Sequence, residues 1–272
     1  MNENFRPAAV AGMFYPESAA VLARDVDAML RAARQPGEVL QTAPKAIIAP
    51  HAGYVYSGPI AASVYAPLAA WRATIRRVVL LGPTHRVAVD GLALPSCAAF
   101  VTPLGRVPID RQAIAGIADL PQVVVSDAAH AQEHSLEVQL PFLQTVLDDF
   151  SLLPLAVGHA SASEVAEVLE RLWGGDETLI VISSDLSHYL PYTAARQSDA
   201  ASAAHILALD AQLDHQQACG ATPVNGLLLA ARRHGLQAHQ IDLRNSGDTA
   251  GDKSRVVGYG AFSFTERAGH EH

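Results

Sequence analysis

Four of the twelve histidines stand where side chains with a chemical role are often found, because three follow short apolar runs and one precedes a helical pattern. In chain order they are His51, His85, His134 and His188. Imidazole is a common metal ligand, and its pKa of about 6.5 also suits acid–base chemistry. A lone histidine in a turn more often just bonds to the backbone, but several at one edge of a sheet indicate a shared cleft.

A third, anionic ligand would complete a metal site. Two histidines and an anion with open positions suit non-haem iron(II) or a similar divalent ion. The glycine-rich stretch 244–254 carries Asp248 and Asp252 ahead of the last apolar run, although a plain turn contains the same residue types. Other carboxylates could orient the imidazoles by accepting hydrogen bonds from the rings, namely Asp185 and either Glu133 or Glu137.

The two cysteines, Cys97 and Cys219, are too few for a disulfide framework and fit a reducing compartment. Cys219 precedes a helical pattern, where the pKa of a thiol can be lowered, but a free cysteine is more often a small buried hydrophobe. We interpret Cys97 as structural. The sequence has no Gly-x-Ser-x-Gly, P-loop or Gly-x-Gly-x-x-Gly pattern, so serine hydrolases, P-loop NTPases and dinucleotide-binding proteins lack support.

Composition excludes several classes of protein. Half of the 272 residues are apolar and 17% are charged, which predicts a folded chain with a large core. The net charge is −8 and no long basic run occurs, so we expect no nucleic-acid partner. No apolar stretch approaches the roughly 18 residues of a membrane span, and the N-terminus lacks a signal-peptide core. We therefore expect a cytoplasmic protein without a membrane partner.

Short apolar runs alternate with helical patterns along the chain. The runs are predicted strands, at 46–49, 78–81, 91–94, 122–125, 152–157, 179–182 and 255–264. The predicted helices are 18–34, 135–147, 161–173, 194–211 and 223–234. Pro141 is expected to kink or delay the second helix. Continuous apolarity is typical of strands covered on both faces, so we predict an α/β fold with a central, mostly parallel or mixed sheet flanked by helices.

No linker, low-complexity tract or internal repeat divides the sequence. We therefore expect a single domain over residues 1–272, with a core at about 6–264 and a flexible tail at 265–272. Ligands of such folds bind at the carboxyl ends of the strands. If the strands are parallel, the three histidines that follow strands share that edge.

Six motifs, in order, resemble the Memo family, also called AmmeMemoRadiSam system protein B. They are Arg6–Pro16 (RPAAVAGMFYP), Pro50–Tyr54 (PHAGY) with Tyr56–Gly58 (YSG), Leu81–His85 (LGPTH), Glu133–Glu137 (EHSLE) with Gln139–Phe142 (QLPF), Ser184–Tyr189 (SDLSHY) and Cys219–Gly220 (CG). The resemblance covers nearly the whole chain. The family in turn resembles class III extradiol ring-cleaving dioxygenases, which hold iron with two histidines and a carboxylate, and this implies a class III extradiol dioxygenase-like α/β fold.

The resemblance implies roles for the four histidines. His51 and His85 match the two metal-binding histidines of the family. His134 and His188 match pocket histidines, and His188 corresponds to the acid–base residue of the dioxygenases. We expect Asp185 to orient His188, and His134 to hydrogen-bond an oxygen species in the pocket. His188, His134 and Asp185 are therefore the candidate catalytic residues.

A third metal ligand also follows from the resemblance. Animal Memo proteins place a cysteine there, but the loop 244–254 contains none. Asp248 is therefore the expected ligand beside the two histidines, with Asp252 as the alternative. A carboxylate in place of a thiolate favours iron(II) or another borderline divalent ion over copper(I). We expect a divalent metal, with iron(II) favoured and zinc or copper as alternatives.

Two functions agree with this resemblance. The first is a metal-dependent oxidoreductase of the dioxygenase type. The alternative is a non-catalytic binding module that reuses the dioxygenase fold for a peptide, small molecule or metal, in a groove that Tyr54 and Tyr56 could line. The family name also implies a functional link to AMMECR-type and radical S-adenosylmethionine proteins.

Overall fold

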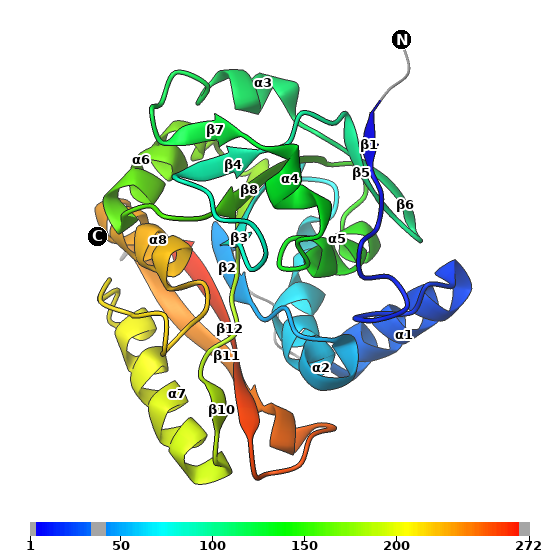
Figure 1. The fold of residues 1–272 in the computed structure, drawn as a ribbon, viewed down its shortest axis with the longest axis vertical. Coiled ribbons are helices and arrows are strands. Elements are labelled where there is room, and N and C mark those ends of the chain that lie inside the picture. The colour runs from blue at the N-terminus through cyan, green and yellow to red at the C-terminus, as the bar shows by residue number, and fades with distance from the viewer. Residues whose placement is uncertain (1–3, 34–41, 267–272) are drawn as a thin grey trace.

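A nine-stranded mixed sheet forms the centre of the protein (Figure 1) in a computed structural model that describes residues 4–33 and 42–266. The strand order is β10-β12-β2-β9-β3-β8-β4-β7, and β11 also pairs with β12. Strands that neighbour one another in the sheet are often distant in the sequence, as crossover connections require. The expected α/β class, with a central mixed sheet flanked by helices, is confirmed.

Four parallel strands occupy the middle of the sheet. In spatial order they are β2 (Ala46–Ala49), β9 (Thr178–Ser183), β3 (Arg77–Pro83) and β8 (Ser151–Val157). Apart from the first residue of β3 and of β8, every residue of these strands is buried. Their sequences are almost continuously apolar because helices cover both faces of the sheet. Parallel alignment brings the carboxyl ends of β2, β9 and β3 to one edge.

Further strands extend the sheet on both sides. On the β2 side lie β12 (Val256–Glu266), β11 (Leu236–Asn245) and β10 (His188–Leu190), all in antiparallel pairs. On the β8 side lie β4 (Leu92–Leu94) and β7 (Val123–Val125). A separate small sheet consists of β1 (Phe5–Arg6), β5 (Ala99–Thr102) and β6 (Gly105–Pro108).

Helices cover the two faces of the large sheet (Figure 1). One face packs against α1 (Ala19–Ala33), α2 (Tyr54–Tyr65) and α5 (Leu140–Val146). The other face packs against α6 (Ala162–Leu172), α7 (Tyr192–Leu207) and α8 (Ala221–Arg233). Each group of helices buries its apolar side chains in its own hydrophobic cluster. The shorter elements are η1 (Ala66–Trp71), α3 (Arg111–Ala115), α4 (Asp127–Ala131), η2 (Glu137–Gln139) and η3 (Ser246–Asp248).

Three elements differ from the sequence prediction for identifiable reasons. The helix predicted at 135–147 starts only at Leu140, because Pro141 sits in its first turn, where a missing N–H costs little. The sequence does not predict α2, since this mostly buried helix is apolar on all sides and contains Pro59. It does not predict β11 either, because polar residues dominate that strand.

The C-terminal strand extends into the segment predicted to be a tail. Thr265 and Glu266, expected to begin a flexible tail, are the last residues of β12. Residues 267–272, and the predicted end of the first helix at residue 34, lie outside the described residues. Within the described part of the chain, no helix combines the length and apolarity needed to cross a membrane.

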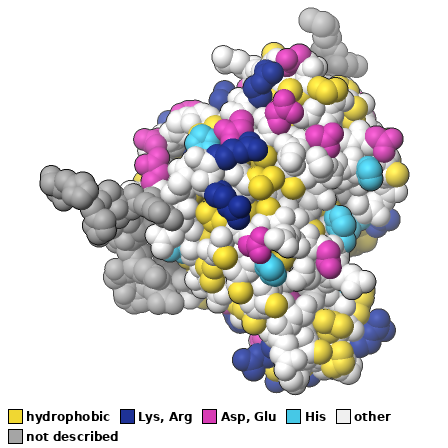
Figure 2. Space-filling view, turned by 90° about the vertical axis from the view of Figure 1, so that its left-hand side faces the viewer, with side chains coloured by type: hydrophobic (Ala, Val, Ile, Leu, Met, Phe, Trp, Pro, Cys, Tyr) yellow, Lys and Arg dark blue, Asp and Glu magenta, His cyan; other side chains and the backbone are white. Residues whose placement is uncertain are grey.

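The face that carries α6, α7 and α8 has a mixed surface (Figure 2). Acidic and basic side chains are interspersed over its upper part, whereas Lys and Arg side chains flank hydrophobic ones at its lower end. Two cation–π contacts lie near β10 and the start of α7. Lys253 lies 4.5 Å from the ring centre of Tyr192, and Arg255 lies 5.1 Å from that of Tyr189.

Candidate metal centre

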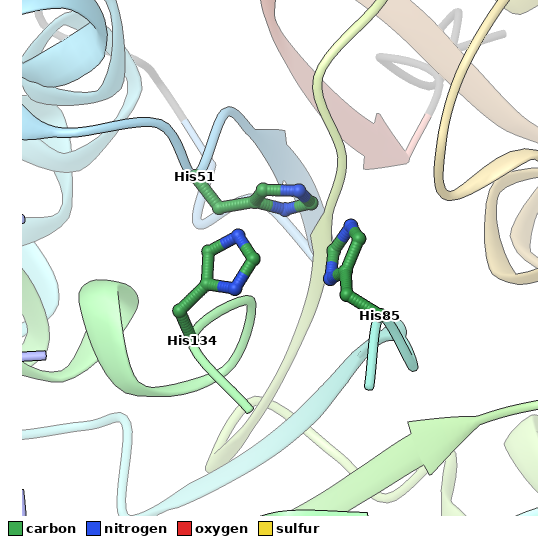
Figure 3. Close-up of side chains that lie close together, drawn as sticks. All are labelled: His51, His85 and His134. Atoms are coloured by element: carbon green, nitrogen blue, oxygen red, sulfur yellow. The ribbon is translucent and has the colours of Figure 1, made fainter. Parts of the chain in front are cut away.

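Three histidines converge at the carboxyl edge of the parallel strands. His51 lies two residues after β2, and His85 lies two residues after β3. His134 comes from the turn between α4 and η2. The three rings point toward one another (Figure 3), and one ligand atom from each lies within 4.8 Å of the other two. The structure thus brings together two of the predicted metal ligands and one of the predicted catalytic residues.

In two of these rings, the Nδ1 nitrogen is hydrogen-bonded to a neighbouring side chain. His51 Nδ1 lies 2.9 Å from Ser183 Oγ. The Ser183 hydroxyl donates to the Ser135 carbonyl at 2.6 Å, so it accepts a hydrogen bond from the Nδ1–H of His51. The lone pair of the His51 ring is therefore on Nε2. His85 Nδ1 lies 2.8 Å from Glu133 Oε1 and donates to that carboxylate. This tautomer leaves the Nε2 lone pair of each ring available to an ion.

Burial keeps two members of the cluster neutral. Burial, followed by the nearby charge of His85, lowers the pKa of His134 to about 4. Burial, then His85 and His134, lower the pKa of His51 well below its usual value. Burial opposes ionisation of Glu133, but hydrogen bonds and charge from His85 outweigh it and bring the pKa of that carboxyl to about 2. The site therefore combines two neutral imidazoles, those of His51 and His134, with one fixed negative charge on Glu133.

Cys219 also faces the cluster, a position the sequence analysis did not assign to it. Its Sγ lies 3.2 Å from His51 Nε2, the nitrogen that carries the free lone pair. Its backbone N–H donates to the Asp185 carbonyl at 3.3 Å. Burial, and then the charge of Asp185, raise the pKa of its thiol to about 12. A cysteine is therefore next to one predicted ligand, His51, but on the loop before α8 and not on the loop 244–254. The Cys219–Gly220 motif was the only signal for it in the sequence.

Asp185 and His188 lie beside the cluster on the segment that follows β9. The buried Asp185 carboxylate accepts from the His51 backbone N–H at 2.7 Å, so it holds the His51 loop and not the ring of His188. Burial raises the pKa of Asp185 to about 7. His188 begins β10, and burial lowers its pKa, as does the charge of His85.

Asp248 lies apart from the three histidines. One carboxylate oxygen accepts from the Tyr192 hydroxyl at 2.5 Å, and the other accepts from the Asn245 backbone N–H at 3.1 Å as part of a capping box of η3. Asp252 accepts from Ser254 within the same loop. The carboxylates of this loop are therefore hydrogen-bonded to groups in or near the loop. The third member of the histidine cluster is His134, where the sequence led us to expect Asp248.

Comparisons with known proteins identify the family of this chain. The family model described as Memo, Memo-like protein, matches residues 6–263. The chain belongs to the Memo family. A MEMO1 family protein of Ignicoccus hospitalis is 37% identical over 95% of this chain and 98% of its own length. One of Aquifex aeolicus is 38% identical over 93% of this chain and 97% of its own length. Memo membership, inferred from the six motifs, is thus confirmed.

A distant likeness is also found among solved structures. The crystal structure of an uncharacterized protein from Escherichia coli K12 matches with a TM-score of 0.49 at 15% sequence identity. It covers 79% of this chain and 98% of that one.

Proposed function

We propose that this Memo-family chain is a metal-dependent oxidoreductase of the dioxygenase type whose ion is held by His51, His85 and His134. The convergence of these imidazoles, with ligand atoms within 4.8 Å of one another, carries the proposal. They lie at the edge of an α/β sheet where ligands usually bind. Within residues 4–33 and 42–266, this is the one group of three or more His, Cys, Asp or Glu side chains close enough to hold an ion.

The donor set fits a transition metal. The lowered pKa values of His51 and His134 mean that both rings offer a lone pair and no positive charge near neutral pH. Metal-bound histidines usually donate their other ring N–H to a carboxylate or another acceptor. Glu133 and Ser183 supply such acceptors for His85 and His51.

We assign Cys219 as a further donor to the same ion. Its sulfur lies 3.2 Å from the metal-facing nitrogen of His51. The raised pKa of about 12 means that the thiol is protonated in the metal-free chain, whereas a bound cation favours the thiolate. Metal binding at this site therefore releases a proton, and the metal affinity is expected to rise with pH.

The residues around the cluster suit proton transfer next to a redox-active ion. Such an ion supplies one-electron chemistry and Lewis acidity toward substrate oxygen atoms. The lowered pKa of His188 leaves its ring neutral near neutral pH, so it can accept a proton from a substrate hydroxyl group. Asp185 fixes the backbone of the loop that presents His51.

The reaction class narrows the choice of metal. Imidazole suits zinc, copper and iron. Zinc has no redox chemistry, so a dioxygenase-type reaction, which passes electrons to O₂, requires a redox-active ion such as iron or copper, and we favour iron(II). With Asp248 bonded elsewhere, this preference rests on the reaction class and no longer on a carboxylate ligand.

Elemental analysis of the chain loaded anaerobically with iron(II) tests the ligand set. We expect about one ion per wild-type chain and loss of that ion in His51→Ala and His134→Ala, because three imidazoles define the site. Asp248→Ala is the matched control and should keep its metal. Retention of the ion by His134→Ala together with its loss from Asp248→Ala would overturn the ligand set.

The role of Cys219 has its own measurement. A thiolate on cobalt(II) produces a charge-transfer band in the near ultraviolet, so we expect this band in the wild-type chain and in Cys97→Ser. It should be absent from Cys219→Ser. A band that survives in Cys219→Ser would exclude the cysteine as a ligand and leave the three histidines as the donors.

Turnover separates the oxidoreductase from a binding module. Oxygen consumption by the iron(II)-loaded chain with a panel of catechol-like substrates is expected to depend on His188. His188→Gln should keep its metal and lose most of its rate, on the order of 10²- to 10⁴-fold for a proton-transfer group. Metal binding without substrate-dependent oxygen consumption in any chain would favour the non-catalytic alternative.

A further inference from the structure

Glu137 is a buried carboxylate whose bonding partners all belong to the N-terminal segment, here residues 5–15. Its side chain is fully buried and forms an ion pair with the Arg6 guanidinium. It accepts from the backbone N–H of Ala9 at 2.8 Å and of Val10 at 3.0 Å. The Tyr15 hydroxyl donates to it at 2.5 Å. These four donors occupy both carboxylate oxygens, so Glu137 is not free to bind a metal ion.

Arg6 extends the same contact to the turn that carries the site residues. Its Nη2 donates to the carbonyl of Glu133 at 2.7 Å, and its Nε donates to the carbonyl of His130 at 3.0 Å. Arg6 is itself buried. One guanidinium thus joins Glu137 to the backbone of the residue whose carboxylate holds His85.

The N-terminal segment also touches the metal cluster directly. The ring of Phe14 lies 4.6 Å, centre to centre, from the ring of His134. The carbonyl of Phe14 accepts from the backbone N–H of Tyr54 at 2.8 Å, and Tyr54 begins α2 three residues after His51. The segment therefore bridges the two loops that carry His51 and His134, which are far apart in the sequence.

The turn itself has little regular structure to fix its shape. Glu133 and His134 belong to neither a helix nor a strand. Their backbones make single hydrogen bonds and no ladder: Glu133 N–H donates to the His130 carbonyl at 3.3 Å, and the His134 carbonyl accepts from Val138 N–H at 3.1 Å. A metal site needs its ligands within a few tenths of an ångström, and ligands on irregular backbone need support from outside. The contacts from residues 5–15 add to the hydrogen bonds that the Glu133 carboxylate accepts from the backbone N–H groups of Ser135 and His85.

We propose that Glu137, through its contacts with the N-terminal segment, is a positioning residue that places Glu133 and His134 for metal binding. This rests on the proposed metal site, because it explains how two residues of that site are held. The proposal goes beyond the metal site in one respect: residues that do not contact the ion, including those of the N-terminal segment, control the affinity of the site for metal.

Glu137→Gln and Tyr15→Phe test the proposal at two strengths. The first replaces the charged acceptor, and the second removes only one hydroxyl donor. The matched control is Asp110→Asn, which breaks a buried carboxylate–arginine contact with Arg77 at the opposite end of β3. We expect Glu137→Gln to lower the affinity for zinc about 10- to 100-fold, as other outer-shell changes do. Tyr15→Phe should lower it less, and Asp110→Asn should leave it unchanged.

A second measurement does not depend on metal. In the metal-free wild-type chain, the ring N–H of His85 that bonds to Glu133 should give a slowly exchanging proton signal in nuclear magnetic resonance spectra. We expect Glu137→Gln and, in part, Tyr15→Phe to weaken this signal, and Asp110→Asn to preserve it. Circular dichroism shows which variants are folded at the temperature used.

The outcomes separate this proposal from the metal site. Wild-type chain that binds no zinc but loses the His85 signal in Tyr15→Phe would contradict the metal site and support the positioning role. Folded Glu137→Gln with wild-type affinity and a wild-type signal would overturn the positioning role. Equal losses of affinity in Asp110→Asn and Glu137→Gln would also overturn it, since the effect would then be one of general destabilisation.

Discussion

Two segments of the chain each carry two acidic residues, 133–137 and 244–254, but these carboxylates have different roles. Glu133 and Glu137 are buried, and their partners lie far away in the sequence: His85 is 48 positions from Glu133, and Arg6 is 131 positions from Glu137. Asp252 bonds within its own loop, and the exposed Asp248 bonds to a neighbouring backbone N–H and to Tyr192. Only the first pair connects parts of the chain that form the site.

The difference follows from where the carboxylates meet their donors. In the low dielectric of the interior a hydrogen bond to a charged group is strong, and a carboxylate left without donors is costly. The buried pair therefore fixes the relative positions of distant segments. At the surface, water competes for the same groups, so the contacts of the exposed pair are weak, and they join the loop only to itself and to Tyr192 at the start of α7.

The largest expected effect is on stability at Glu137. Glu137→Gln leaves the buried Arg6 guanidinium without its counter-charge, so we expect the free energy of unfolding to fall by about 3–5 kcal/mol. Urea denaturation followed by circular dichroism measures this change. A decrease in the free energy of unfolding below about 1 kcal/mol would be typical of an exposed acidic residue and would contradict the distinction between the two segments.

The next effect concerns the metal. Glu133→Gln removes the charged acceptor of the His85 ring N–H, so we expect the affinity for zinc to fall about 10- to 100-fold. Asp252→Asn is the control in the exposed loop and should bind zinc as the wild-type chain does. Competition with a chromophoric chelator gives both affinities. Equal values for the two variants would remove the distinction between the segments.

The loss of stability at acid pH should depend on the buried His130. His130 is buried beside the Glu133 turn, and burial lowers its pKa from the usual 6.5 to about 4. The folded chain then binds fewer protons than the unfolded chain at intermediate pH. Its contribution is present above about pH 6.5 and is lost as the pH falls toward 4. From about pH 7 to about pH 5, the free energy of unfolding should fall by about 2 kcal/mol more in the wild-type chain than in His130→Gln. Parallel pH curves for the two chains would contradict this assignment.

The smallest effect is expected in the exposed loop. Asp248→Ala removes one side of a capping box and the contact with Tyr192, and such surface caps contribute about 0.5–1 kcal/mol. Thermal unfolding of this variant should therefore differ little from that of the wild-type chain. A loss as large as that of Glu137→Gln would show that the loop supports the fold in a way its contacts do not indicate.

Local patterns made much of the fold predictable. The apolar runs identify β2, β3, β8 and β9, because central parallel strands must be apolar on both faces. The histidines directly after β2 and β3 were recognisable for the same reason, since their position depends on where a strand ends. In contrast, α2 escaped prediction because a helix that is apolar all round has no polar face to give a period.

The sequence by itself therefore determined the α/β class, Memo membership, and the position of His51 and His85 at one edge of the sheet. Tertiary structure alone decided what joins them: His134 in place of Asp248 in the cluster, and Cys219 against His51 across 168 positions of the chain. It also decided that Glu137 is buried against the N-terminal segment. The physical reason is range. Strand and helix patterns record contacts between near neighbours, whereas these contacts form only when distant segments pack together, and no local period encodes which distant partner a polar side chain will meet.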